Sequence, residues 1–276
     1  MATFRVGHTG ITWGYGLEQA EVAVKDVAEL GYCAYETFGS VLEQYEQEQP
    51  GGFGAVLERY GIPLSAAYCP TRFYDPADAA PDIDNVTRWM RLAHKLGGST
   101  IVLATGKRRP EPYAAYQGMA EVFNELGQRA RDLGLMTAIH PHTGTIIETR
   151  AEIDGILQAV NPDLVGFAPD TGQIAKGGSD PVAALDTYKG LIRHVHLKDY
   201  GGGVETGYAG YAPIGFGVVD MPALFRILEE ADFGGWVMVE LDDTPQRPRP
   251  PREAATMSRR YLEQLLGNRA VWARPC

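Results

Sequence analysis

Short apolar runs alternate with longer amphipathic stretches along the chain, and the alternation repeats eight times. The runs are typical of buried β-strands, because they are a few residues long and are bounded by glycine, proline or polar residues. They predict strands at Phe4–His8, Tyr32–Glu36, Pro63–Tyr68, Thr100–Ala104, Met136–His140, Leu164–Pro169, Ile192–Lys198 and Trp236–Leu241.

The stretches between these runs carry apolar residues at helical spacing. In the stretch 19–30, Ala20, Val24, Val27 and Leu30 fall on one stripe of a helix. The same spacing predicts further helices, with a shorter one near Phe53–Tyr60; they are Ile83–Leu96, Tyr113–Leu133, Arg150–Val160, Pro181–Tyr188, Met221–Ala231 and Arg252–Leu266.

The ends of these helices carry the expected residues. Glycine follows four of them, at positions 31, 61, 97 and 134, and glycine adopts the left-handed helix terminus without a Cβ clash. Asp180 and Asp220 precede two others and are predicted N-caps.

Eight strand–helix units without a break in composition predict a parallel sheet with helices on its faces. We expect one α/β domain, a closed (β/α)8 barrel over residues 1–266, with an open doubly wound sheet as the alternative. The sequence contains neither GxGxxG after the first strand nor GxxxxGK[ST], which disfavours nucleotide-binding folds. Residues 267–276 lack a helical pattern and form a predicted tail, a candidate contact between subunits of a homo-oligomer.

The composition and charge of the chain indicate which kinds of binding partner are disfavoured. The 276 residues are 45 % hydrophobic and carry a formal net charge of −10, which disfavours nucleic-acid binding because that depends on basic patches. The first residues lack a basic start followed by an apolar core, and no apolar run approaches about 18 residues, so we expect a cytoplasmic protein with no membrane partner. Cys33 and Cys69 fall in apolar runs and are predicted buried thiols.

In a barrel of this kind the chemistry lies at the carboxyl ends of the strands. Ionisable side chains gather there: His8, Glu36, His140, His142, Asp170, His194, His196, Lys198, Glu240 and Asp242. They include five of the chain's six histidines. Side chains two apart on a strand share a face, so we expect these groups to point into the barrel mouth. Asp199 and Asp243 have the opposite parity and are predicted solvent or loop groups.

Two carboxylates and two imidazoles converging in a barrel mouth suit one divalent ion, such as Mn, Co, Zn or Fe. His196 and Asp170 are the stronger ligand candidates. Asp170 could instead cap the turn at Thr171 and Gly172, and His194 is better explained as a buried histidine with hydrogen-bond partners. The long Gly- and Tyr-rich connection at 200–217 is either an active-site lid or a surface loop.

Several motifs resemble those of inosose dehydratases, members of the xylose isomerase-like superfamily of sugar isomerases, epimerases and lyases. They are HPHTGT at 140–145, DTG at 170–172, HVHLKD at 194–199, PIGFG at 213–217 and GWVMVE at 235–240. The resemblance is dense from about Leu133 onward; before that it covers mainly GITW at 10–13 and the segment 31–36. It implies a xylose isomerase-like TIM barrel.

The resemblance also implies a site. The family's metal ligands fall on His140, Asp170, His196 and Glu240, and manganese is the expected ion, with Co, Zn, Fe or Mg as alternatives. His140 departs from the isomerases and epimerases, which have a glutamate there, and a single imidazole suits an elimination better than a symmetric two-glutamate proton shuttle.

Four further positions are expected to contact the substrate: His8, Trp13, Gln173 and Phe216. Gln173 stands where the family has a histidine after DTG, and an amide orients by hydrogen bonding but cannot titrate. Phe216 stands where an acidic residue is usual, which indicates a larger or less polar substrate.

The implied function is a metal-dependent lyase that removes the α-proton of a keto-sugar or keto-cyclitol and eliminates the β-substituent, the metal stabilising the enolate. His142, Lys198, Glu36 and Glu240 are the candidates for the catalytic base and acid. The alternatives are a ketose isomerase or epimerase, a protein that only binds sugar, and an enzyme that cleaves 3-keto-glycosides by β-elimination. Phe216 and the tyrosines at 200, 208 and 211 would suit an aromatic leaving group in the last case.

Overall fold

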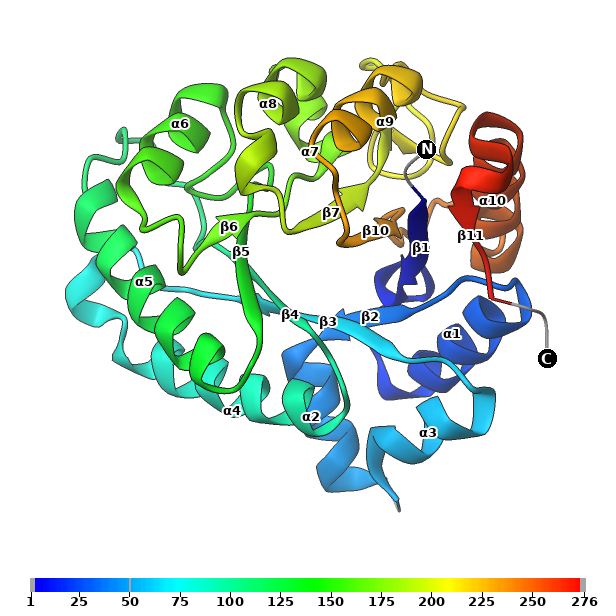
Figure 1. The fold of residues 1–276 in the computed structure, drawn as a ribbon, viewed down its shortest axis with the longest axis horizontal. Coiled ribbons are helices and arrows are strands. Elements are labelled where there is room, and N and C mark those ends of the chain that lie inside the picture. Colours follow the sequence, from blue (N-terminus) through cyan, green and yellow to red (C-terminus); the bar gives the residue numbers. More distant parts are fainter. Residues whose placement is uncertain (1–2, 50, 274–276) are drawn as a thin grey trace.

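The computed structural model describes residues 3–49 and 51–273, and its central feature is a ring of parallel strands (Figure 1). In chain order the ring contains β1 (Phe4–Thr9), β2 (Tyr35–Phe38), β3 (Leu64–Pro70), β4 (Thr100–Ala104), β5 (Met136–His140), β6 (Gly166–Phe167), β7 (His194–Leu197) and β10 (Trp236–Val239). Strand β10 returns to pair with β1. Two bridges, Phe167 with Ile192 and Asp170 with His196, link the region of β6 to β7. The predicted (β/α)8 barrel is therefore confirmed and the open sheet is wrong.

The helices lie outside the strand ring (Figure 1). They are α1 (Leu17–Glu29), α2 (Gly39–Glu48), α3 (Gly52–Tyr60), α4 (Ala80–Lys95), α5 (Tyr116–Asp132), α6 (Arg150–Ala159), α7 (Thr171–Lys176), α8 (Pro181–Thr187), α9 (Met221–Glu230) and α10 (Pro251–Leu266). Single 3-10 turns occur at Gly10–Trp13, Pro76–Asp78, Lys189–Leu191 and Gly267–Arg269. A short antiparallel pair, β8 (Asp199–Tyr200) with β9 (Tyr211–Ala212), follows β7.

The predicted helix ends are confirmed. All four glycines have positive φ, from 62° at Gly61 to 80° at Gly97. Asp180 accepts a hydrogen bond from the N–H of Val182, and Asp220 accepts one from the N–H of Ala223. Among the strands, β4 and β5 have the predicted bounds, whereas β2 begins at Tyr35 rather than Tyr32, because the N–H of Tyr32 still bonds to a carbonyl of α1.

Small residues fill the middle of the barrel. Ala66, Val102, Ala138 and Ala168 form one buried cluster there, while the alternate residues of the same strands pack against the helices. Barrels of this class usually carry layers of bulky branched side chains. The small layer leaves room above it for the large ionisable side chains at the strand ends.

The tail adds to the same sheet. Residues 270–271 form β11 (Ala270–Val271), which pairs with the start of β1, beside α10 in Figure 1. The ring of Trp272 meets that of Tyr32 edge-on at 5.6 Å between centroids. Trp272 thus packs within one chain, whereas Val271 is 40 % exposed. The oligomer contact stays a prediction, and Cys276 lies outside the described residues.

Two other predictions concern cysteines and membranes. Cys69 is buried as predicted, whereas Cys33 is only partly buried. Within the described residues, none of the helices has the length and apolar character needed to cross a membrane.

Candidate active site and metal centre

A cavity of about 250 Å³ opens at the carboxyl end of the barrel strands. Most of the residues that line it come from strand ends and the loops after them, and they are Thr9, Ile11, Tyr15, Glu36, Thr37, Phe38, Tyr68, His140, His142, His196, Ala209, Glu240, Asp242, Asp243 and Thr244. Three of the four metal ligands implied by the resemblance are therefore exposed to one space.

The fourth implied metal ligand, Asp170, is fully buried and does not line the cavity. His140, Asp170 and His196 each offer one ligand atom within 4.8 Å of the others. His140 Nε2 lies 3.9 Å from Asp170 Oδ2, and His196 Nδ1 lies 3.1 Å from Glu240 Oε2. Residues from four different strand ends, far apart in sequence, converge as the pattern predicted.

The polar atoms of this group fit a cation. Asp170 Oδ2 and His196 Nδ1 are buried and make no hydrogen bond within the part of the chain that the structure describes, although each lies 3.1 Å from an ion-pair partner, Lys198 Nζ and Glu240 Oε2 respectively. Buried polar atoms are rarely left without a hydrogen bond, so each of these two atoms calls for an explanation. Burial, reinforced by the charge of neighbouring His196, holds the pKa of His140 well below its usual range, so this imidazole is neutral, as a metal ligand must be. The residues present therefore suit a divalent ion bound by nitrogen and oxygen.

Asp170 serves two purposes. Its Oδ1 accepts a hydrogen bond of 2.9 Å from the N–H of Gln173 and caps α7, while its Oδ2 faces His140 and Lys198. From the sequence, helix capping and metal binding were alternative roles of Asp170. Because each role uses a different carboxylate oxygen, Asp170 can fill both.

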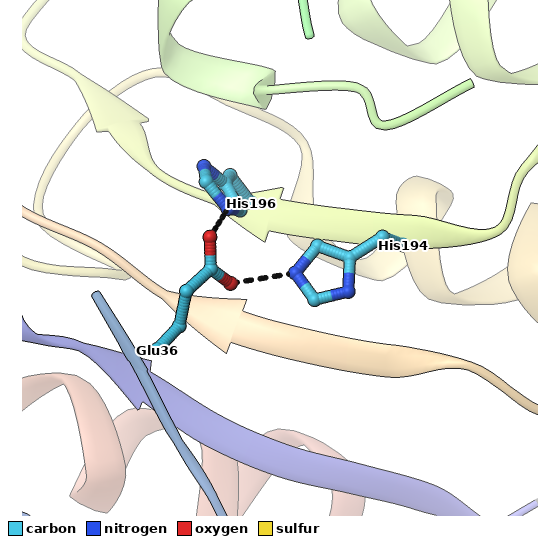
Figure 2. Close-up of side chains that lie close together, drawn as sticks. All are labelled: Glu36, His194 and His196. Carbon is cyan, nitrogen blue, oxygen red and sulfur yellow. Dashed lines mark hydrogen bonds and ion pairs between the residues drawn. The ribbon is translucent and has the colours of Figure 1, made fainter. Parts of the chain in front are cut away.

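Glu36 lies inside the barrel between two histidines of β7 (Figure 2). Its Oε2 accepts a hydrogen bond of 2.7 Å from His194 Nε2, and its Oε1 accepts one of 2.8 Å from His196 Nε2. Burial alone would raise the pKa of Glu36, but the charges of His196 and His194 and their hydrogen bonds outweigh it and lower the pKa to about 2. Likewise, burial would lower the pKa of His196, but Glu36 and Glu240 raise it to about 9. Glu36 is thus an ionised carboxylate with both oxygens engaged.

Lys198 is fully buried among three carboxylates. Its Nζ lies 2.6 Å from Glu240 Oε1, 2.8 Å from Asp242 Oδ1 and 3.1 Å from Asp170 Oδ2. Burial opposes the charged form, but these carboxylates hold the pKa of Lys198 well above its usual range. A permanently protonated lysine cannot accept a proton, so this environment favours a fixed cation over a base.

His142 is placed differently from the other candidates. It lines the cavity and is only partly buried. Its Nδ1 lies 2.7 Å from the carbonyl oxygen of Thr143, and since a carbonyl can only accept, Nδ1 carries the proton. In the neutral ring Nε2 then holds the lone pair.

The four residues expected to contact substrate lie outside the cavity lining. His8 and Trp13 are buried and meet edge-on at 5.1 Å, and the indole N–H of Trp13 donates to Asp26. Gln173 is buried, and its Oε1 accepts hydrogen bonds from Thr143 and Tyr211. Phe216 is 60 % exposed. None of the four lines the cavity.

The prediction for Asp199 and Asp243 is wrong in part, because Asp199 lies off the cavity as its parity predicts but is not a solvent group, and Asp243 does reach the cavity. Asp199 is fully buried and accepts hydrogen bonds from the N–H groups of Tyr200, Gly215, Gly217 and Val219. Asp243 lines the cavity. Strand β10 ends at Val239, so the two-residue alternation no longer applies at Asp243.

The connection at 200–217 folds over the site rather than away from it. Ala209, at its tip, lines the cavity and has a φ of 55°. Tyr208 and Tyr211 are buried with Leu241. Two of the three tyrosines that were candidates for an aromatic subsite thus stabilise the loop, and the third, Tyr200, is partly buried against the same cluster.

The aromatic side chains that do line the cavity were not singled out in the sequence. Tyr15 packs on Phe38 with ring centroids 5.3 Å apart, and Phe38 meets Tyr68 edge-on at 5.1 Å. Tyr68 in turn meets His140 at 5.2 Å. We call Tyr15, Phe38 and Tyr68 the aromatic wall. Only Tyr68 had a signal in the sequence, as the last residue of a predicted strand.

Comparison with known proteins agrees with this geometry. Residues 24–265 match the family model described as xylose isomerase-like TIM barrel. An inosose dehydratase of Geobacillus kaustophilus (strain HTA426) is 28 % identical, over 95 % of each chain. Among solved structures, the IolI protein with a bound zinc atom has a TM-score of 0.78 at 18 % identity and covers 96 % of this chain and 99 % of its own. The 3-keto-D-glucoside 4-epimerase YcjR of E. coli has a TM-score of 0.72 at 19 % identity, covering 95 % of this chain and 99 % of its own.

Proposed function

Because the chain belongs to the xylose isomerase-like TIM barrel family, we propose that it is a metal-dependent lyase acting on a keto-sugar or keto-cyclitol. Removal of the α-proton would be followed by elimination of the β-substituent. The similarity to an inosose dehydratase over nearly the whole chain supports a dehydration. The observation that carries the proposal is the convergence of His140, His196 and Glu240 at one cavity with Asp170 next to them, where Asp170 Oδ2 and His196 Nδ1 are buried without a hydrogen bond.

A divalent ion held by His140, Asp170, His196 and Glu240 would act as a Lewis acid on the carbonyl oxygen and so favour enolisation. Manganese is our proposed ion. Zinc is the first alternative, because the similar IolI structure carries it and because imidazole and carboxylate suit both metals.

The chain supplies the proton chemistry. His142 Nε2 has its lone pair free, since Nδ1 donates to Thr143, and is the base that takes the α-proton. The resulting imidazolium returns this proton to the departing β-hydroxyl, which leaves as water, so that the reaction consumes no net proton. The ammonium group of Lys198 forms ion pairs with Asp170, Glu240 and Asp242 and offsets part of their negative charge. It does not exchange a proton with the substrate.

The test is the mass of the product. Metal-loaded protein is incubated with 2-keto-inositol and with simple ketoses, beside a metal-free control. A dehydratase gives a product lighter by one water. A product of unchanged mass would mean isomerisation or epimerisation, and no product from any ketone would refute the lyase.

The aromatic wall favours a second candidate, cleavage of 3-keto-glycosides by β-elimination of the aglycone. Tyr15 lines the cavity yet is 65 % exposed, and an aromatic leaving group would cover it, whereas a cyclitol is polar on every edge. Aromatic rings in offset or edge-on contact gain about 0.5–1.5 kcal/mol beyond burial. This candidate predicts faster release of phenol from a phenyl 3-keto-glucoside than of methanol from the methyl compound. Equal rates, corrected for leaving-group reactivity in solution, would contradict it.

A further inference from the structure

Glu36 is the one carboxylate at the strand ends whose two oxygens both bond to histidines (Figure 2). It is 1 % exposed, and His194 and His196 are equally enclosed. Because a carboxylate anion can only accept, both imidazoles must present an N–H to it. For His196 this nitrogen is Nε2.

The proton on Nε2 determines what the other side of the ring offers. When the ring gives up its second proton to a bound ion, the lone pair lies on Nδ1, the atom 3.1 Å from Glu240 Oε2 and without a hydrogen bond within the described residues. The ring thus has one side fixed by Glu36 and the other turned toward Glu240.

Two other roles for Glu36 fit the geometry less well. A second metal ion between Glu36, His194 and His196 is suggested by their clustering. However, separations of 2.7 and 2.8 Å are those of direct hydrogen bonds between the nitrogen and oxygen atoms. A catalytic base would need a free oxygen, and both oxygens are engaged.

We propose that Glu36 is a positioning residue that fixes the tautomer and orientation of His196, so that Nδ1 is presented to the divalent ion. The inference rests on the proposed metal centre and assigns Glu36 no contact with substrate. His194 occupies the second oxygen of Glu36 and keeps its carboxylate from rotating. Carboxylates that hold a metal-binding histidine in this way orient the ring and raise its basicity, and their loss typically lowers metal affinity about 10- to 100-fold.

The experiment measures zinc affinity by competition with a chelator, independently of any substrate. Glu36→Ala is expected to weaken zinc binding about 10- to 100-fold. Glu36→Gln should recover part of the loss, since its amide oxygen can still accept from His196. His194→Phe removes the other partner and should have a much smaller effect than Glu36→Ala.

Asp82 provides the matched control for a buried carboxylate. It is 7 % exposed, accepts hydrogen bonds from the backbone N–H groups of Arg72 and Phe73 and does not line the cavity. Asp82→Asn should lower the melting temperature and leave zinc affinity unchanged. A loss of affinity as large as that in Glu36→Ala would mean a general structural effect and would overturn the proposal.

A spectroscopic readout separates orientation from stability. In zinc-loaded protein with ¹⁵N-labelled histidine, wild type should show a His196 Nε2–H proton protected from exchange, lost in Glu36→Ala and kept in Asp82→Asn. Unchanged affinity in Glu36→Ala, or a His196 bound through Nε2, would overturn the role of Glu36 alone. A wild-type chain that binds no metal would overturn the metal centre as well.

Discussion

At the scale of single residues, Asp170 divides its two oxygens between structure and chemistry. Oδ1 caps α7 through the N–H of Gln173, and Oδ2 faces the ligand group. Asp170→Asn keeps an oxygen that can cap but removes the charge, whereas Asp170→Ala removes both.

We therefore expect both variants to lose bound metal, and only Asp170→Ala to lose in addition about 1 kcal/mol of stability through the missing cap. Metal content after dialysis and urea unfolding of the metal-free proteins measure the two effects. Full metal content in Asp170→Asn would remove this residue from the ligand set.

A substitution of His142 separates the proposed proton transfer from metal binding. Replacing it by glutamine keeps a polar side chain of similar size that cannot take up a proton. We expect kcat to fall about 10²–10⁴-fold, with metal content unchanged, because His142 lies beside the ligand group and not in it. Steady-state kinetics with metal analysis decide the point, and a variant that keeps its kcat would exclude His142 as the base.

Much of the candidate site could be predicted from residue types and strand parity. His140 and His196 lie at the ends of strands with clear apolar alternation, and the structure brings both into one cavity. Parity failed at Asp243, which lines the cavity, because β10 ends at Val239. The tyrosines at 208 and 211 were assigned to an aromatic subsite, but they are buried in the loop, since sequence alone does not say which way an irregular segment turns its side chains.

At the scale of elements, Asp199 holds the segment 215–219 to the end of β7 through three backbone N–H groups, those of Gly215, Gly217 and Val219. A Cβ at position 217 would lie 2.3 Å from Asp199 Oδ1, so glycine is required there. The glycines of PIGFG therefore have a packing explanation.

Asp199→Ala should free this segment. We expect a loss of roughly 2–3 kcal/mol in the free energy of unfolding, since hydrogen bonds to a charged group are removed, and faster amide exchange at Gly215, Gly217 and Val219. Exchange followed by NMR measures the local effect, with Asp180→Ala, a surface cap of α8, as the comparison. Equal exchange in wild type and Asp199→Ala would show that the loop holds without the carboxylate.

The elements themselves were predictable where burial is periodic. Strands β4 and β5 match the expected bounds because their apolar residues alternate between the barrel interior and the helices. Helix α2 was missed, since it follows β2 directly and contains few apolar positions. Strand β6 is only two residues long, because its pairing with β7 continues through single bridges rather than a full ladder.

At the scale of the whole molecule, His8 links the stability of the barrel to pH. It is buried edge-on between Trp13 and Tyr32, and burial lowers its pKa from 6.5 to about 4. The unfolded chain thus binds more protons between these values, so the contribution of His8 is present above pH 6.5 and is lost as the pH falls toward 4.

His8→Phe keeps an aromatic ring and removes the titration. Between about pH 7 and pH 4 the free energy of unfolding of metal-free wild type should fall by roughly 3 kcal/mol more than that of the variant. Urea unfolding at several pH values gives both curves. Parallel curves would mean that His8 does not stay neutral in the folded protein.

Removal of the α-proton is common to the proposed dehydration and to the cleavage of 3-keto-glycosides, and proton NMR in heavy water detects it most directly. Manganese-loaded protein would first be incubated with 2-keto-inositol, simple ketoses and a 3-keto-glucoside, and the manganese removed before spectra are taken. We predict loss or exchange of the proton beside the carbonyl, together with an eliminated product, and neither in Asp170→Asn. No exchange with any of these ketones, in protein shown to contain the metal, would contradict the proposed lyase.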